Sequence, residues 1–326
     1  MKFFFPFLLF VLCSCEINKT VIDSDFKIYR FENHLFNSTE LDFIESQKKW
    51  DVELGAFSNS YYSFMTGVNS SSDSLIKNQL LLFINNKDMR EVYDTIYNKF
   101  KDFSNIKNQL DLAFSENSQI FPRQPNPKII TMFSGFNYGV VVQDSLISIG
   151  LDFYLGDNSI FYDRLGDSAY LKFQKQEKFI LPNIMEAWYD SYFSIHHKKS
   201  NFLSELIYKG KIMFLLSKTL SEHSLEDRLR YSQEELSWCN ENEAFIWKFL
   251  IENNLLFSTR DKEYRSYLNH SPFSKGMTTE SPSRVAYFIG YEIVKKYMSI
   301  NNDISLNELM LQDDYMLILN QSKYKP

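Results

Sequence analysis

The side chains best suited to metal chemistry lie in the stretch YFSIHHKKSNFLSELIYKGK, residues 192–211. His196 and His197 are adjacent on one expected helix, and Glu205 lies on the expected helix that follows. Imidazole and carboxylate groups are the usual ligands of a hydrolytic zinc ion. In the pattern His-Glu-x-x-His, one helix face carries two such imidazoles, and the glutamate activates the zinc-bound water. The stretch therefore raises the question of whether a metal site is present.

The spacing of the two histidines does not fit that pattern. If His197 is the second ligand, Phe193 occupies the position of the first ligand and Ser194 that of the general base. If His196 is the second ligand, these positions fall on Tyr192 and Phe193. Adjacent helical residues also point in different directions, so the two imidazoles cannot readily share one ion. The sequence therefore predicts neither a metal nor another cofactor.

Two interpretations of the histidines follow from the sequence. In the first, they lie at a partly exposed helix end, where Lys198 and Lys199 complement the helix dipole. In the second, His197 and Glu205 approach each other across a helix-turn-helix and serve as non-standard ligands of a zinc peptidase. Two protein ligands make a poor catalytic zinc site, and we expect the first interpretation to hold.

Composition excludes several classes of function. The chain has 326 residues, 44% of them hydrophobic and 17% aromatic, which is ample for a core. The formal net charge is −6, and no basic cluster suited to phosphates appears, so nucleic-acid binding is not expected. No nucleophile elbow, P-loop or dinucleotide-binding fingerprint occurs in the sequence.

The N-terminus, MKFFFPFLLFVLCSC, predicts export and lipidation. Its apolar run of about ten residues is too short to span a membrane, so residues 1–14 are expected to be a signal peptide. The letters LCSC resemble a bacterial lipobox, which implies that Cys15 is lipidated and attaches the protein to a membrane. Residues 15–27 then form the lipidated N-terminus and a tether. In the group of bacteria whose lipoproteins this N-terminus resembles, an acidic block after the cysteine directs lipoproteins to the cell surface. The tether lacks such a block, so the resemblance implies the periplasmic face of the outer membrane, with the inner membrane as the alternative.

The rest of the chain, residues 28–326, is expected to be one α+β body that is mostly helical. Residues 28–120 show helical spacing of apolar residues. In the part from 121 to 326, the runs IITMFSG, YGVVVQD and LISIGLDFYLG predict a small antiparallel sheet, with Asp-Ser forming a tight hairpin turn. Further helices are expected at 168–177, 182–199, 201–219, 232–256 and 282–298.

The last of these helices carries the clearest local signals. Ser281 and Pro282 suit its N-cap and first position. Gly290 lies in the middle of the helix, where glycine is unfavourable, so it predicts close packing against a neighbouring backbone. A further set shares one face that could line a cleft: Arg284, Tyr287 and Tyr291.

Part of the chain is similar to a family of predicted zinc-dependent proteases. FLSELIYKGKIMFLL resembles the second helix of that family, in which the pattern Leu-x-Glu-x-Ile-x-Glu-Gly provides a glutamate as third zinc ligand. Lys209 occupies the corresponding position here, and its ammonium group repels a cation. SRVAYFIGYEIVKKYM also resembles the closing helix of that family. The resemblance implies a degenerate zincin-like architecture whose cleft, with His196, His197, Glu205 and Lys209, has lost its ligands.

Four segments carry a resemblance to a second family: ISIGLDFYLG, LIYKGKIMFLL, WCNENEAFIWKFLIENNLLF and PFSKGMTTESPSRVAYFIGYEIVKKYM. In this order and spacing they resemble the gliding-motility lipoproteins called GldB, over roughly residues 120–300. The sequence departs from the expected pattern at 277–279 and at Ser283.

The resemblance implies a lipid-anchored envelope component of the gliding apparatus of Bacteroidota and of its associated protein secretion. Its expected partners are other proteins of that machinery, and its expected role is non-catalytic assembly or interaction, so no enzyme is predicted. The alternative is the zinc peptidase with non-standard ligands. A third hypothesis, a solute- or glycan-binding lipoprotein, depends only on the aromatic content.

Overall fold

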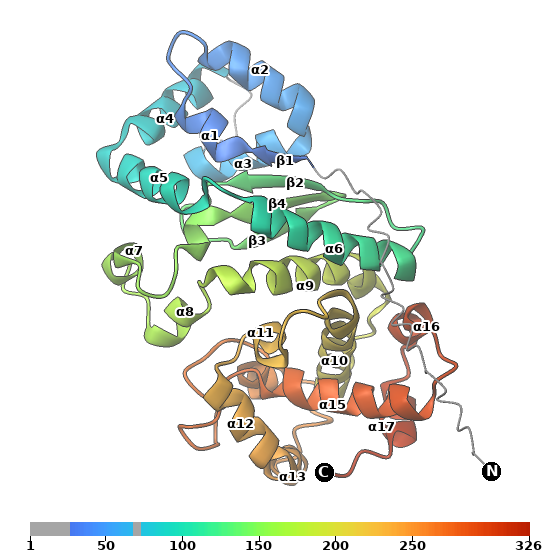
Figure 1. Cartoon of the computed structure of the whole chain (residues 1–326). Helices are drawn as coiled ribbons and strands as arrows, with labels where there is room; N and C mark the ends of the chain where they lie inside the picture. Colours follow the sequence, from blue (N-terminus) through green and yellow to red (C-terminus); the bar gives the residue numbers. More distant parts are fainter. Residues whose placement is uncertain (1–26, 68–72) are drawn as a thin grey trace, which may run out of the picture.

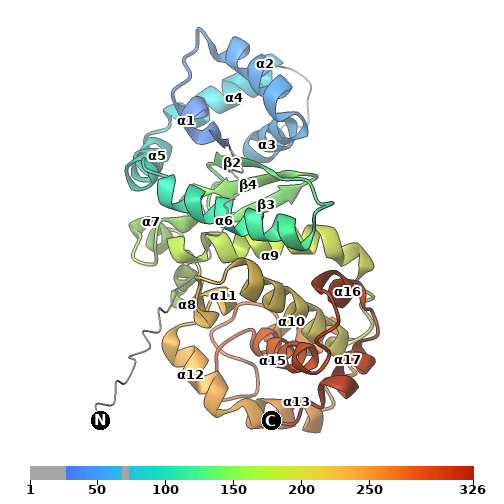
Figure 2. The ribbon, with the colours of Figure 1, turned by 45° about the vertical axis from the view of Figure 1, so that its right-hand side comes forward.

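The structure is a computed structural model that describes residues 27–67 and 73–326. The sheet consists of β1 (Ile28–Arg30), β2 (Lys128–Met132), β3 (Val140–Gln143) and β4 (Leu146–Gly150). Figures 1 and 2 show α1–α4 on one side of the sheet, α9 on the other, and the helices from α10 onwards as a group beyond α9. The predicted α+β class is confirmed, whereas the zincin-like architecture stays a prediction.

Most of the described chain is helical. The helices between β1 and β2 are α1 (Phe31–Phe36), α2 (Phe43–Leu54), α3 (Ala56–Thr66), α4 (Asp73–Asn85), α5 (Lys87–Phe100) and α6 (Ser104–Ile120). Those between β4 and residue 219 are α7 (Ile160–Arg164), α8 (Ala169–Phe173), α9 (Ile180–Phe193) and α10 (Phe202–Thr219). The remaining helices are α11 (Leu225–Leu229), α12 (Gln233–Glu241), α13 (Glu243–Glu252), α14 (Asp261–Tyr264), α15 (Val285–Ile300), α16 (Leu306–Leu311) and α17 (Tyr315–Ser322). No helix among the described residues is long and apolar enough to cross a membrane.

The prediction of an entirely antiparallel sheet is wrong. The strand order is β1-β2-β4-β3, in which β1 and β4 both run parallel to β2 and only β3 and β4 are antiparallel. Alternating apolar residues identify strands but not their neighbours, so the pattern could not show that β4 lies between β2 and β3. The predicted hairpin turn is confirmed, since Gln143 pairs with Leu146 across Asp144, whose φ is 53°.

The predicted boundaries agree best with the structure for the helix whose first residue follows a capping box. Helix α10 begins after Asn201, which forms a capping box with Ser204, and it fits the predicted range 201–219. The predicted helix at 232–256 is interrupted after Glu241, giving α12 and α13.

Three other boundaries differ from the prediction. The predicted helix at 168–177 is shortened to α8, whose cap is Ser168. The predicted helix 182–199 ends at Phe193 and continues only as a 3-10 turn, Ser194–His196. The last helix begins at Val285 rather than Pro282, because Ser281 Oγ donates to Thr278 O instead of capping.

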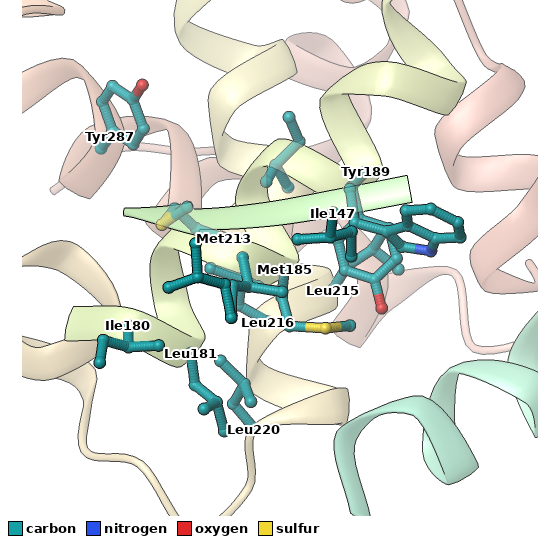
Figure 3. Close-up of a cluster of buried hydrophobic side chains, with 14 of the residues drawn as sticks. Ile147, Ile180, Leu181, Met185, Tyr189, Met213, Leu215, Leu216, Leu220 and Tyr287 are labelled. Carbon is teal, nitrogen blue, oxygen red and sulfur yellow. The ribbon is translucent and has the colours of Figure 1, made fainter. Parts of the chain in front are cut away.

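Helices α10 and α15 cross at two glycines. A Cβ atom on Gly210 would lie 2.2 Å from the backbone of Gly290, and one on Gly290 would lie 2.0 Å from the carbonyl oxygen of Leu206. The close packing predicted for Gly290 is therefore confirmed. Figure 3 shows the adjoining core, in which Met185 and Tyr189 of α9 lie in one apolar cluster with residues of β4 and α10.

Candidate functional site

A charged cluster connects α9, α10 and α15 around the carboxylate of Glu186. Arg230 Nη2 lies 2.6 Å from Glu186 Oε2, and Arg284 Nη2 lies 3.3 Å from the same oxygen. Lys209 Nζ is 3.6 Å from Glu186 Oε1, and the Tyr287 hydroxyl donates to that oxygen at 2.9 Å. One carboxylate thus has three cations and one hydroxyl as partners.

The two arginines reach Glu186 because each lies at a helix boundary in the left-handed conformation. Arg230 follows α11 with φ 61°, and Arg284 precedes α15 with φ 58°. Both are almost fully buried, at 3% and 4% exposure. Arg230 also donates from Nε to Asn183 Oδ1 at 2.9 Å and from Nη2 to Pro182 O at 2.9 Å. Left-handed residues other than glycine are uncommon, so the surrounding contacts must hold both guanidinium groups in place.

The electrostatics of the cluster fix Glu186 in its charged form. Burial of the carboxylate would raise its pKa, but the charges of Arg230, Arg284 and Lys209 overcome burial and hold the pKa well below its usual value. A general base needs a pKa near the working pH and access to the proton that it removes. The lowered pKa makes Glu186 a poor general base, and its carboxylate is the shared anion of a largely buried ion-pair network.

The residues present around Glu186 do not fit a zinc ion. A His-Glu-x-x-His frame centred on Glu186 places the two ligand positions at Met185 and Tyr189, both fully buried in the apolar core. Neither a thioether nor an unionised phenol is a usual zinc ligand. Lys209 adds a positive charge beside the carboxylate. Within residues 27–67 and 73–326, no three His, Cys, Asp or Glu side chains are grouped so that they could hold a metal ion.

The predicted pair of His197 and Glu205 does meet. His197 Nε2 lies 2.6 Å from Glu205 Oε1, its Nδ1 lies 2.5 Å from the Tyr315 hydroxyl, and its ring stacks on Tyr208 at 4.1 Å between centroids. Each ring nitrogen already has a hydrogen-bonding partner, one on α10 and one on α17. The imidazole therefore links these two helices, and neither nitrogen is free to bind a metal ion in this arrangement. His196 is exposed and does not join this group.

Of the predicted cleft face on the last helix, two residues belong to the cluster around Glu186. The Arg284 guanidinium lies over the Tyr287 ring at 3.7 Å, and both contact Glu186. Tyr291 lies one turn further along the helix, where its ring faces Lys295.

A further cation of α10, Lys211, is buried beside Tyr315 and does not contact Glu186. Lys211 is fully buried, its Nζ donates to the carbonyl oxygen of Gln312, and it lies 5.0 Å from the centre of the Tyr315 ring. Burial lowers the pKa of Lys211 to about 7, although Asp313 acts in the opposite direction.

Sequence reasoning missed Glu186 and Arg230. A signal existed for Glu186, because it is the only charged residue in the apolar run ILPNIMEAWY, and a lone charge in such a run indicates a buried ion pair. No comparable signal existed for Arg230, which lies in a loop. Cys15, the predicted lipidation site, lies outside the described residues.

Comparison with known families gives one result. The family model described as gliding motility protein GldB matches residues 13–326. Comparison with curated proteins and with solved structures gave no match.

Proposed function

Since the chain belongs to the GldB family of gliding motility proteins, we propose that it serves gliding as a non-catalytic interaction protein of the cell envelope. In this proposal Cys15 carries the lipid, and the body lies at the periplasmic face of the outer membrane. Its partners are other proteins of the gliding machinery and of the associated secretion machinery.

The observation that carries the non-catalytic role is the closed charge network at Glu186. Its carboxylate is shared among Arg230, Arg284 and Lys209, and the positions where a hydrolytic zinc site needs imidazoles hold Met185 and Tyr189. Such a network supports a fixed shape, which an assembly component needs, rather than proton transfer.

Metal content and gliding together test this proposal. The full chain is purified from membranes in detergent, dialysed against trace zinc, and assayed for zinc per chain. We expect far less than one zinc per chain. In a strain that lacks the protein, Glu205→Gln should restore gliding whenever it accumulates to the wild-type level, with Glu234→Gln as the exposed control.

The opposite results would favour the zinc peptidase. Stoichiometric zinc that is lost in His197→Ala, together with loss of gliding in a stable Glu205→Gln protein, would overturn the non-catalytic role. Recovery of no motility or secretion protein in a pull-down of the full chain from native envelope would contradict the interaction role.

A further inference from the structure

A groove lies on the face of the sheet opposite α9. Its deepest part is an apolar hollow of about 300 Å³ between α3 and the strands. Ser60 and Phe64 line it from α3, and Val141, Gln143 and Ser148 line it from the sheet. The hollow is open to solvent, since Phe64 and Val141 are 43% and 37% exposed. Large apolar side chains at the rim of a hollow are typical of a surface that a partner covers.

The strand beside this hollow has an unpaired edge. In the order β1-β2-β4-β3, strand β3 is at the end of the sheet. Gly150 N donates to Gly139 O at 2.9 Å, so by the two-residue alternation of an antiparallel pair Val141 also bonds to β4, whereas Val140 and Val142 direct their N–H and C=O groups outward. No hydrogen bond between described residues reaches these outward groups.

The groove extends along the whole strand. A second hollow of about 290 Å³ shares Phe57 and Gln143 with the first and continues past Lys128 and Asp144. At about 3.3 Å per residue, a chain that follows residues 138–144 covers roughly 20 Å. This length suits a short extended segment, and the second hollow offers a cation and an anion at its far end.

We propose that an extended segment of a partner protein docks along β3 and inserts an aliphatic or aromatic side chain into the hollow beside Val141. Unpaired strand groups are satisfied by another extended backbone, which a helix or a small apolar molecule does not offer. The adjacent hollow would then select the side chain that points to this face, because side chains of a strand alternate between its faces. The opposite edge, β1, has three residues and offers less to pair with. This inference deepens the interaction role proposed above by giving it a site.

The test uses a displayed library of random twelve-residue peptides, selected on the full chain in detergent. We expect enriched peptides with apolar residues at alternate positions. Ser60→Trp, which fills the hollow from an exposed position, should weaken binding of the best peptide at least tenfold, and Asn59→Trp on the same helix should change it less than twofold. Val142→Pro, which removes an outward N–H that β4 does not use, should also weaken binding tenfold, whereas Val142→Thr should not.

Each other outcome overturns the inference. If no peptide is enriched, no extended segment docks along β3. The same conclusion follows if neither Ser60→Trp nor Val142→Pro weakens the binding of the enriched peptides. Sensitivity to Ser60→Trp alone identifies a pocket for an apolar molecule. Binding that appears only after residues 16–26 are deleted identifies the chain's own tether as the occupant. All these outcomes leave the zinc and gliding assays unaffected, so the two proposals can fail separately.

Discussion

The cluster around Glu186 and the groove along β3 differ in which of their polar groups are satisfied. In the cluster, a mostly buried carboxylate faces Arg230, Arg284 and Lys209, and both of its oxygens have partners. In the groove, apolar side chains surround a hollow, and no hydrogen bond from a described residue reaches the outward backbone groups of Val140 and Val142. The carboxylate oxygens of the cluster thus have partners within the protein, whereas the groove keeps backbone hydrogen-bonding groups available for a partner.

The charged cluster therefore supports a rigid shape, whereas the groove is suited to binding a partner. Charged groups buried together must satisfy one another, and a change of any member is costly. A strand edge that holds no buried charges has no such constraint, and it loses little when it is altered. Mutations in the two regions should therefore have very different effects on stability. The first and last of the following four predictions compare the regions directly, and the other two concern further buried polar groups of α10 and α17.

The largest effect is expected from Glu186→Gln. It removes the carboxylate that both guanidinium groups contact, and leaves the charges of Arg230 and Arg284 without this partner. Breaking a buried ion pair in this way costs about 3–5 kcal/mol of unfolding free energy. Urea denaturation measures the loss, and Glu234→Gln at an exposed site should not shift the midpoint. A loss below about 1 kcal/mol would show that the cluster is not rigidly coupled.

The next effect depends on pH and concerns Lys211. Its pKa is about 7 in the folded protein but about 10.4 in an unfolded chain, so between these values only the unfolded state holds the proton. Stability should therefore rise with pH by about 1.4 kcal/mol per unit from pH 7 to 9.5. Lys211→Met should remove this rise, which denaturation at several pH values can measure. Equal slopes in the two proteins would contradict a neutral buried lysine.

A smaller loss is expected from His197→Phe. The substitution keeps a ring stacked on Tyr208 but leaves Glu205 and the Tyr315 hydroxyl without their partner. Unsatisfied buried groups of this kind cost about 1–3 kcal/mol. Hydrogen exchange of α17 should accelerate with the loss of stability, while His196→Phe at the exposed neighbour should leave exchange unchanged. If His197→Phe left the stability unchanged but abolished an effect of added zinc on hydrogen exchange, His197 would be a metal ligand instead.

The smallest effect is expected in the groove. Ser60→Trp adds a large ring to a hollow that is open to solvent, so the free energy of unfolding should change by no more than about 0.5 kcal/mol. Denaturation of this variant beside Glu186→Gln compares the two regions directly. A loss of several kcal/mol from Ser60→Trp would mean that the hollow is closed in solution.

The sequence predicted those features that local signals encode. Helix α10 was predicted because it has a capping residue at Asn201 and a continuous apolar pattern. The close packing at Gly290 was predicted because glycine is unfavourable in the middle of a helix unless a neighbouring backbone needs the space. The contact between His197 and Glu205 had been considered only within the zinc-peptidase alternative, where the short connection between two helices allows the two residues to approach.

The remaining features depend on contacts between distant segments. Arg230 and Arg284 come from loops and adopt left-handed conformations that no nearby pattern indicates. The parallel pairing of β1 with β2 joins residues about a hundred positions apart, and alternation within a strand does not reveal its neighbour. The position of β3 at the edge follows from the strand order β1-β2-β4-β3, so it could not be predicted from the sequence either.

The contact between Gly210 and Gly290 has a consequence for how the chain tolerates enlargement. Because α10 and α15 touch there, the segment 220–284 begins and ends at two helices that are in contact with each other. The entropy of closing such an excursion grows slowly with its length, by about 0.6 kcal/mol for each doubling. We expect that an independently folding domain inserted at the exposed turn of Asn253 and Asn254 would leave the frame intact. The contact between the two glycines would then keep α10 and α15 together while the inserted domain lies outside them.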